Sequence, residues 1–357
     1  MPWLGEPVPS LPCRRLLDLG EQQVRRLARH PRLPNPFGLL TGPFAVAGRP
    51  PVQVMAPGPN SAPPAETPAP GTDHLVWRTT TVQGRPTTYG VAGSGMPVLF
   101  LHGWALGQHS YKRALKRLVR LGCQVYAPAM PGFGGTADLP RRSVDLVGYA
   151  TWVRAFLDAV GVVEPVFVIG HSFGGGVAVQ LAHDYQERVS YLVLINSVGG
   201  ATWLQAGSRV RSMAERPLWD WVLAFPGDLF PLRGVAGLSR VMLEDALPNV
   251  LHNPLGLWRA GQVARRADLT AELRELKARG MPMVALRSDQ DNIIPKASFE
   301  ALCAAIGSSG EIVHGHHSWL LADPDTFGEV MANSLAVARE ARRLEGEVHG
   351  PGQVVDA

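Results

Sequence analysis

Hydrophobic residues from about position 74 onward form short, continuous runs that alternate with stretches of helical periodicity. A continuous apolar run bounded by glycine or turn residues is typical of a strand buried on both faces. Strands are predicted in this way at 76–82, 87–91, 98–102, 124–127, 166–169, 191–195 and 283–286, the first two forming a hairpin. Strands that alternate with helices predict an α/β fold, with a mostly parallel central sheet flanked by helices and joined by right-handed crossovers.

The clearest helical periodicity follows two of these strands, at 111–121 and 175–187. In the first segment Leu115, Leu118 and Val119 share one face, while lysines and arginines share the other. This arrangement favours an amphipathic helix whose basic face is solvated, over an anion-binding role for that face.

One stretch interrupts the alternation. Residues 200–280 contain no strand-like run, but they carry tryptophans and phenylalanines within helical patterns. An insertion that follows one strand and ends where the next begins indicates a helical cap over the carboxyl edge of the sheet. Its aromatic residues either form the core of the cap or line a pocket, and the sequence leaves both open.

Proline dominates the N-terminal part of the chain. Residues 50–71 are too rich in proline for a helix or a central strand and indicate an extended linker, while 16–30 has the spacing of a short amphipathic helix. That helix is expected to lie on the main domain, with a membrane surface or a partner as alternatives. The predicted organisation is an N-terminal extension at 1–71, a core at 72–199 and 281–345, a cap at 200–280 and a flexible tail at 346–357.

Composition narrows the class of protein. The 357 residues are 46% hydrophobic and 18% charged, which excludes a wholly disordered chain. The net charge of +4 is mild and spread along the chain, so a nucleic-acid partner is not expected. Cys13, Cys123 and Cys303 form no CxxC pair, so neither a disulfide framework nor a thiolate zinc site is predicted.

The sequence has neither a signal-peptide pattern at its start nor an apolar run of about 18 residues. A cytoplasmic protein without a membrane span, a metal or a cofactor is expected, and the oligomeric state stays open.

A candidate nucleophile follows the strand at 166–169. The sequence Gly170-His171-Ser172-Phe173-Gly174 leads from this strand into the helix at 175–187. A G-x-S-x-G motif is specific only in this strand–turn–helix context, because the sharp turn lifts the serine hydroxyl above the sheet edge. The following helix also directs amide N–H groups at the same place.

The succession of strands and helices along the chain, together with this motif, resembles the α/β-hydrolase superfamily over residues from about 72 to 341. The resemblance implies a triad in the order serine, acid, histidine. It selects His317 from the cluster of histidines at 314–317, because this histidine stands seven residues before Pro324. A metal site is a weak alternative for that cluster, since no carboxylate or thiolate stands nearby at ligand spacing.

The acid is expected after the strand at 283–286, where two aspartates are available. In related hydrolases the orienting aspartate stands four residues before a proline, which fits Asp291 and Pro295. Asp289 is the structural alternative, as a residue that caps the turn. Another branch of the superfamily places the acid after the strand corresponding to 191–195, but Asn196 and Ser197 follow that strand here.

The resemblance also implies an oxyanion hole formed by the backbone N–H groups of Phe173 and Trp104, the latter in the sequence His102-Gly103-Trp104. His102 itself is expected to be structural. The residues expected around the substrate are Trp104, Phe133, His171, Trp203 and Trp319.

A serine nucleophile argues against epoxide hydrolases and haloalkane dehalogenases of this superfamily, which use aspartate. The predicted activity is hydrolysis of a carboxylic ester or related acyl compound, with a hydrophobic small-molecule substrate. Carbon–carbon bond hydrolysis and acyl transfer are alternatives on the same fold, and Arg209, Arg211 and Arg216 are candidates to hold an acidic carbon–carbon substrate. A ligand-binding protein without catalysis is a further alternative.

Overall fold

The computed structural model describes residues 74–200 and 241–348. Its contacts divide the chain into a unit of residues 66–338 and a second unit formed by residues 1–65 and 339–357. The sheet, the helices that cover it and the candidate site lie in the first unit. The N-terminal extension, residues 349–357 of the predicted C-terminal tail and Trp203 lie outside the described residues, whereas residues 346–348 form the end of a helix.

A mixed sheet of eight strands forms the centre of this unit, in the order β1-β2-β4-β3-β5-β6-β7-β8. β1 and β2 form an antiparallel hairpin that pairs with β4, and all pairings from β4 to β8 are parallel. The strands are β1 Val76–Val82, β2 Arg85–Ala92, β3 Met96–Leu101, β4 Cys123–Pro128, β5 Val166–His171, β6 Val189–Ile195, β7 Met283–Ser288 and β8 Glu311–Val313. The predicted α/β architecture and mostly parallel sheet are therefore confirmed.

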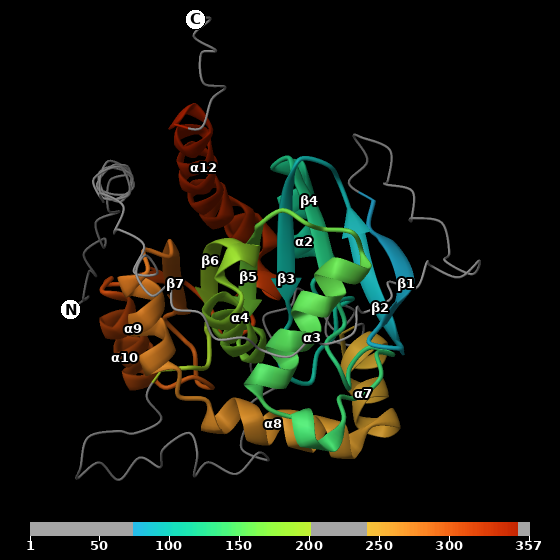
Figure 1. Cartoon of the computed structure of the whole chain (residues 1–357). Helices are drawn as coiled ribbons and strands as arrows, with labels where there is room; N and C mark the ends of the chain where they lie inside the picture. Colours follow the sequence, from blue (N-terminus) through green and yellow to red (C-terminus); the bar gives the residue numbers. More distant parts are fainter. Residues whose placement is uncertain (1–73, 201–240, 349–357) are drawn as a thin grey trace, which may run out of the picture. The chain divides into compact units, whose positions relative to one another are not determined.

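Helices cover both faces of the sheet (Figure 1). One face packs against α3 (Leu146–Ala159), α4 (Phe173–Asp184), α9 (Thr270–Ala278) and α10 (Lys296–Ile306). The other packs against α2 (Lys112–Arg120), α11 (Trp319–Ala322) and the first part of α12 (Pro324–Val348).

Side-chain alternation along the strands explains the two cores. In β3, Leu99 and Leu101 lie in the first core, whereas Val98 and Phe100 lie in the second. Successive strand residues point to opposite faces, so a strand between two helix layers needs apolar residues at every position. This requirement produced the continuous hydrophobic runs in the sequence.

Between β6 and β7 the structure describes η3 (Met242–Ala246), α7 (Leu247–His252), α8 (Pro254–Arg266) and α9. In Figure 1, α7 and α8 lie beyond the end of the sheet at which the central parallel strands finish. η3 and α7 are anchored to the loop after β3. Asn249 donates to the carbonyl of Ala105, and the buried carboxylate of Asp245 accepts from the backbone N–H of Ser110 at 2.7 Å. Among the described helices, none combines the length and the apolar character required to cross a lipid bilayer.

Candidate active site

Ser172 stands at the junction of β5 and α4 with φ 54° and ψ −116°. A positive φ is uncommon for a residue with a side chain and has to be held by its surroundings. Here the Ser172 N–H donates to the carbonyl of Ile195 at 2.9 Å, and its carbonyl accepts from Gly175 and Val198 at 3.0 and 3.2 Å. These bonds fix the sharp turn between strand and helix.

Two glycines allow the turn to pack closely. A Cβ on Gly174 would lie 2.2 Å from the carbonyl oxygen of Leu101, and one on Gly170 would lie 2.5 Å from the Cα of Gly175. Neither distance is possible for a side-chain carbon. The glycines of the motif therefore let the start of α4 approach the end of β3, where Gly103 and Trp104 follow.

His317 contacts Asp291, with 3.0 Å between Nδ1 of the imidazole and Oδ2 of the carboxylate. The Asp291 side chain is fully buried, and its second oxygen accepts from the N–H groups of Ile293 and Ile294 at 2.8 and 2.9 Å. Burial by itself raises the pKa of Asp291, but the neighbouring His317 and these hydrogen bonds hold the pKa below its ordinary value. Asp291 is therefore an ionised partner for the histidine.

Asp289, the alternative acid, faces elsewhere. Its carboxylate accepts from the N–H of Gly315 and contacts Nδ1 of His314, both at 2.9 Å. These contacts lower the pKa of Asp289 and tie the end of β7 to the loop after β8. The two aspartates thus have separate partners.

Ser172 and His317 line the same cavity, of about 20 Å³. This volume accommodates about one water molecule. The described residues around it come from four separate segments of the chain and are Gly103, Trp104, Leu106, His171, Ser172, Ile293, His317 and Ser318. The fold therefore brings together the serine, the histidine and the loop after β3.

Comparison with known proteins agrees with this architecture. A profile of the family described as alpha/beta hydrolase fold matches residues 96–232. The chain is 27% identical over 265 residues to a putative non-heme haloperoxidase of Mycobacterium phage D29, an alignment that covers 71% of this chain and 92% of that protein.

A second relative and a solved structure also match most of this chain. The chain is 28% identical over 252 residues to the putative carbamate hydrolase RutD of Escherichia coli O9:H4 (strain HS), covering 67% of this chain and 91% of the relative. The crystal structure of a membrane phospholipase A, described as a bacterial virulence factor, superimposes with a TM-score of 0.61 at 22% identity, covering 76% of this chain and 87% of that one.

The chain has the α/β-hydrolase fold, and the family model that matches residues 96–232 supports its resemblance to the α/β-hydrolase superfamily. The motif at Ser172 and the alternation of strands and helices along the chain predicted this resemblance, and the comparisons confirm it.

A hydrogen-bond network connects the turn at Ser172 to the other segments of the site. His171 contacts the hydroxyl of Tyr111 through Nδ1 at 2.7 Å and the carbonyl of His317 through Nε2 at 3.1 Å. Burial and the neighbouring His317 lower the pKa of His171 to about 3, so its ring is neutral. A carbonyl can only accept, so Nε2 carries the proton and Nδ1 accepts from Tyr111.

Two further contacts complete this network. The hydroxyl oxygen of Tyr111 accepts from the N–H of Gly103 at 3.0 Å, which joins the loop after β3 to the nucleophile turn. The side-chain amide of Asn196 donates to the carbonyl of His317 at 2.6 Å. The backbone of His317 is therefore held from two directions.

His102 connects two loops at the carboxyl edge of the sheet. Its Nδ1 donates to the carbonyl of Gly103 and its Nε2 accepts from the N–H of Met130, both at 2.9 Å. Burial lowers the pKa of His102 to about 4, which matches a neutral ring with one donor and one acceptor. The histidine connects the loops that follow β3 and β4.

The residues expected around the substrate fall into three groups. Trp104 and His171 line the cavity beside Ser172, and the indole of Trp104 is fixed by a 2.7 Å hydrogen bond to the carbonyl of Leu257 in α8. Phe133 and Trp319 are buried in the two hydrophobic cores, Phe133 edge-on to His102. Trp203, Arg209, Arg211 and Arg216 lie outside the described residues.

Sequence reasoning did not identify Tyr111 and the role of Asn196. Tyr111 stands at the start of a helix with no motif around it. Asn196 had a signal, because it directly follows β6, where a related branch carries its acid. An asparagine there excluded the acid, but its contact with His317 depends on residues 121 positions apart.

Proposed function

We propose that this protein is a serine hydrolase that cleaves a carboxylic ester or a related acyl compound through an acyl-enzyme on Ser172. The observation that supports this proposal is the buried pair of His317 and Asp291 beside the cavity that Ser172 lines. A serine hydroxyl needs a base to take its proton, and an imidazole oriented by a carboxylate supplies one.

In the proposed reaction, Oγ of Ser172 attacks the acyl carbon while Nε2 of His317 accepts the hydroxyl proton. The carbonyl oxygen becomes an oxyanion that accepts hydrogen bonds from the backbone N–H groups of Trp104 and Phe173. The bond to the leaving alcohol breaks as His317 returns the proton to it. A water molecule activated by the same histidine then releases the acid and restores Ser172, while Asp291 stabilises the transient imidazolium.

Phe173 is the first residue of α4. Its N–H is therefore one of the first backbone donors of the helix, which have no acceptor within the helix. Trp104 lines the cavity beside Ser172. These positions support the two donors proposed for the oxyanion hole. Each such donor is worth about 3 kcal/mol of the activation barrier.

The proposed substrate class rests on the lining of the cavity and on the relatives of this chain. Carbamate hydrolysis, the activity named for the Escherichia coli relative, also attacks an acyl carbon and is within reach of the same steps. A hydrophobic substrate is proposed because Trp104, Leu106 and Ile293 surround the serine. We also retain residues 200–280 as a proposed cap, in view of the contacts of α7 and α8 with the loop after β3.

Turnover of p-nitrophenyl esters from acetate to long acyl chains, measured beside Ser172→Ala, tests this function. Activity in the natural protein alone is the expected result, together with labelling of Ser172 by a serine-directed phosphonate. Labelling without ester turnover would contradict the ester substrate and favour carbon–carbon bond hydrolysis or acyl transfer. Resistance to the phosphonate would contradict the nucleophile itself and favour a binding protein.

A further inference from the structure

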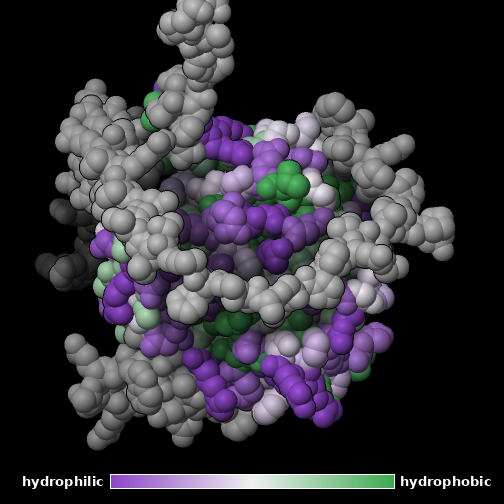
Figure 2. Space-filling view, in the orientation of Figure 1, coloured by the Kyte–Doolittle hydropathy of each residue, from purple (hydrophilic) through white to green (hydrophobic). Residues whose placement is uncertain are grey.

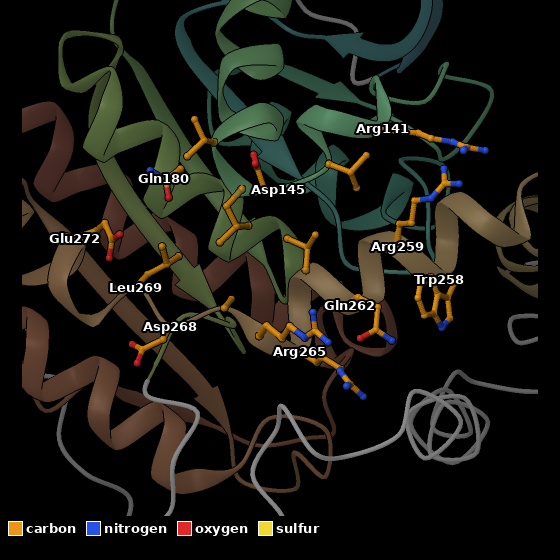
Figure 3. Close-up of a pocket in the computed structure, with 16 residues that line it drawn as sticks. Arg141, Asp145, Gln180, Trp258, Arg259, Gln262, Arg265, Asp268, Leu269 and Glu272 are labelled. Carbon is orange, nitrogen blue, oxygen red and sulfur yellow. The ribbon is translucent and has the colours of Figure 1, made fainter.

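A second, larger pocket lies away from the candidate active site. Its volume is about 750 Å³, within the range of about 300–1,000 Å³ that is usual for small-molecule sites. It is bordered by the segment before α3, the start of α3, α4, α8 and the connection from α8 to α9 (Figure 3). None of its lining residues borders the cavity at Ser172.

Apolar side chains form part of the wall of this pocket. They include Val144 before α3, Leu146 at the start of α3, Val263 of α8, and Leu269 before α9. Trp258 of α8 is 56% exposed and lies at the same pocket. In the space-filling view, hydrophobic surface is visible in the region between α3 and α8, with hydrophilic side chains at its border (Figure 2). The pocket can therefore accept an apolar group.

Three of the arginines that line this pocket have no partner in the described parts of the chain. Arg141, Arg259 and Arg266 all line it, and none forms a hydrogen bond or an ion pair with a residue of 74–200 or 241–348. In the view of Figure 3, the side chains of Arg141 and Arg259, from different elements, extend toward the same end of the pocket. Two positive charges at one end of a pocket favour the binding of an anion there.

The carboxylates of the pocket do not neutralise this end. Asp145 accepts from the N–H of Gly148 at 2.7 Å and caps α3. Asp268 accepts from the N–H and hydroxyl of Thr270 at 3.1 and 2.8 Å. In Figure 3, Asp268 and Glu272 lie toward the opposite end of the pocket from Arg141. The pocket is thus polarised, with uncompensated positive charge at one end.

We propose that this pocket binds a small amphiphilic anion, with its carboxylate or phosphate on Arg141 and Arg259 and its apolar chain along Val144, Leu146 and Val263. Guanidinium groups suit this role because they bind carboxylate and phosphate oxygens with paired, charge-assisted hydrogen bonds. The site is independent of the chemistry proposed for Ser172, since the two cavities share no residue.

Isothermal titration of the full-length protein with octanoate and octyl phosphate, each below its micellar concentration, tests the proposal. At least one of the two should bind with one-to-one stoichiometry, and the comparison identifies the preferred headgroup. The double variant Arg141→Gln/Arg259→Gln should weaken this binding by about tenfold or more, because both charged partners are removed. The control Arg113→Gln/Arg274→Gln removes the same charge at exposed positions outside the pocket and should stay within about twofold.

Octanol distinguishes anion recognition from apolar binding. It should bind at least about tenfold more weakly than the better anion, because it carries no charge for the arginines. Equal binding of octanol, or unchanged anion binding by the double variant, would overturn the proposal. Binding of the protein to phosphatidylglycerol vesicles, without binding of either free amphiphile, would also overturn the proposal.

A last measurement separates the two cavities. Protein whose Ser172 carries the phosphonate should bind the anion as the unlabelled protein does. Loss of binding after labelling would place the anion at Ser172 and overturn the proposal. A failure of ester turnover, in contrast, would leave these titrations unaffected and concern only the proposed function.

Discussion

At Ser172 the backbone adopts a conformation that costs a residue with a Cβ about 1–3 kcal/mol. Hydrogen bonds from Gly175 and Val198 to its carbonyl, and from its own N–H to Ile195, hold this conformation in place. The hydroxyl is thereby presented at the cavity that His317 also lines. Local strain and the proposed chemistry are thus located in one residue.

Replacing Ser172 by glycine should increase stability while abolishing turnover. Glycine reaches φ 54° without the steric cost of a Cβ, although it adds about 0.5–1 kcal/mol of chain entropy in the unfolded state. We expect the free energy of unfolding, measured by urea denaturation, to be about 1 kcal/mol higher for Ser172→Gly than for Ser172→Ala. An alanine variant as stable as the glycine variant would show that the turn carries no such strain.

The two aspartates after β7 should differ sharply in their effect on activity. Asp291→Asn removes the charge that orients and stabilises the His317 imidazolium, and kcat should fall by about 10³–10⁴-fold. Asp289→Asn affects contacts with Gly315 and His314 rather than with His317, so kcat should change by less than about threefold. Ester kinetics of both variants provide the measurement. Equal losses would contradict the assignment of Asp291 as the acid.

Residue spacing explains how much of the candidate site was predictable. The serine stands in a motif whose strand and helix were recognisable, and Asp291 and His317 stand at fixed distances from prolines in segments that the resemblance singled out. Tyr111 carries no such local pattern, and the position of Asn196 directly after β6 does not reveal its contact with His317. Their contacts with His171 and His317 arise only when loops 60 and 121 residues apart meet at one edge of the sheet.

Among the elements, strand ends decide where the site forms. β3, β5, β6 and β7 are parallel neighbours, so the loops after them lie at one edge. The strands themselves were predictable because burial on both faces requires continuous apolar runs. β8 was missed, since it has only three residues and Ile312 at its centre is 61% exposed.

Asn196, at the end of β6, links this strand to β7 and to the loop that carries His317. Its amide donates to Oγ of Ser288 and to the carbonyl of His317, and its Oδ1 accepts from the N–H of Ser288. Asn196→Ala should leave buried partners unsatisfied, which lowers the free energy of unfolding by about 2–4 kcal/mol. We also expect kcat to fall by about tenfold or more as His317 loses an anchor.

Urea denaturation and ester kinetics at a temperature well below the melting transition provide the two measurements for Asn196→Ala. Asn333→Ala, at an exposed position on α12, is the control and should change neither quantity. If kcat of Asn196→Ala matched that of the control, the amide would have no part in positioning His317.

On the scale of the whole molecule, the buried histidines make stability depend on pH. His102 and His171 are neutral in the folded protein, with pKa values lowered by burial from 6.5 to about 4 and about 3. The unfolded chain binds a proton on each below about pH 6.5, whereas the folded chain does not until far lower pH. By linkage, the free energy of unfolding rises with pH wherever the unfolded state binds more protons. Stability should therefore be highest above pH 6.5 and decline as the pH falls toward 4.

His102→Gln isolates one part of this effect, because glutamine can donate and accept without titrating. A pKa difference between 6.5 and about 4 corresponds to roughly 3 kcal/mol between neutral pH and pH 4. The loss of stability between pH 7 and pH 4.5, measured by urea denaturation at each pH, should be smaller in His102→Gln than in the natural protein. The pKa of Asp291 is lowered in the folded state, below the ordinary value of 3.8. Its contribution to stability is therefore lost only as the pH falls below about 3.8, outside the range from pH 7 to pH 4.5. Equal pH dependence in both proteins would show that His102 is not buried as a neutral ring, and the link that it forms between the loops after β3 and β4 would have to be revised.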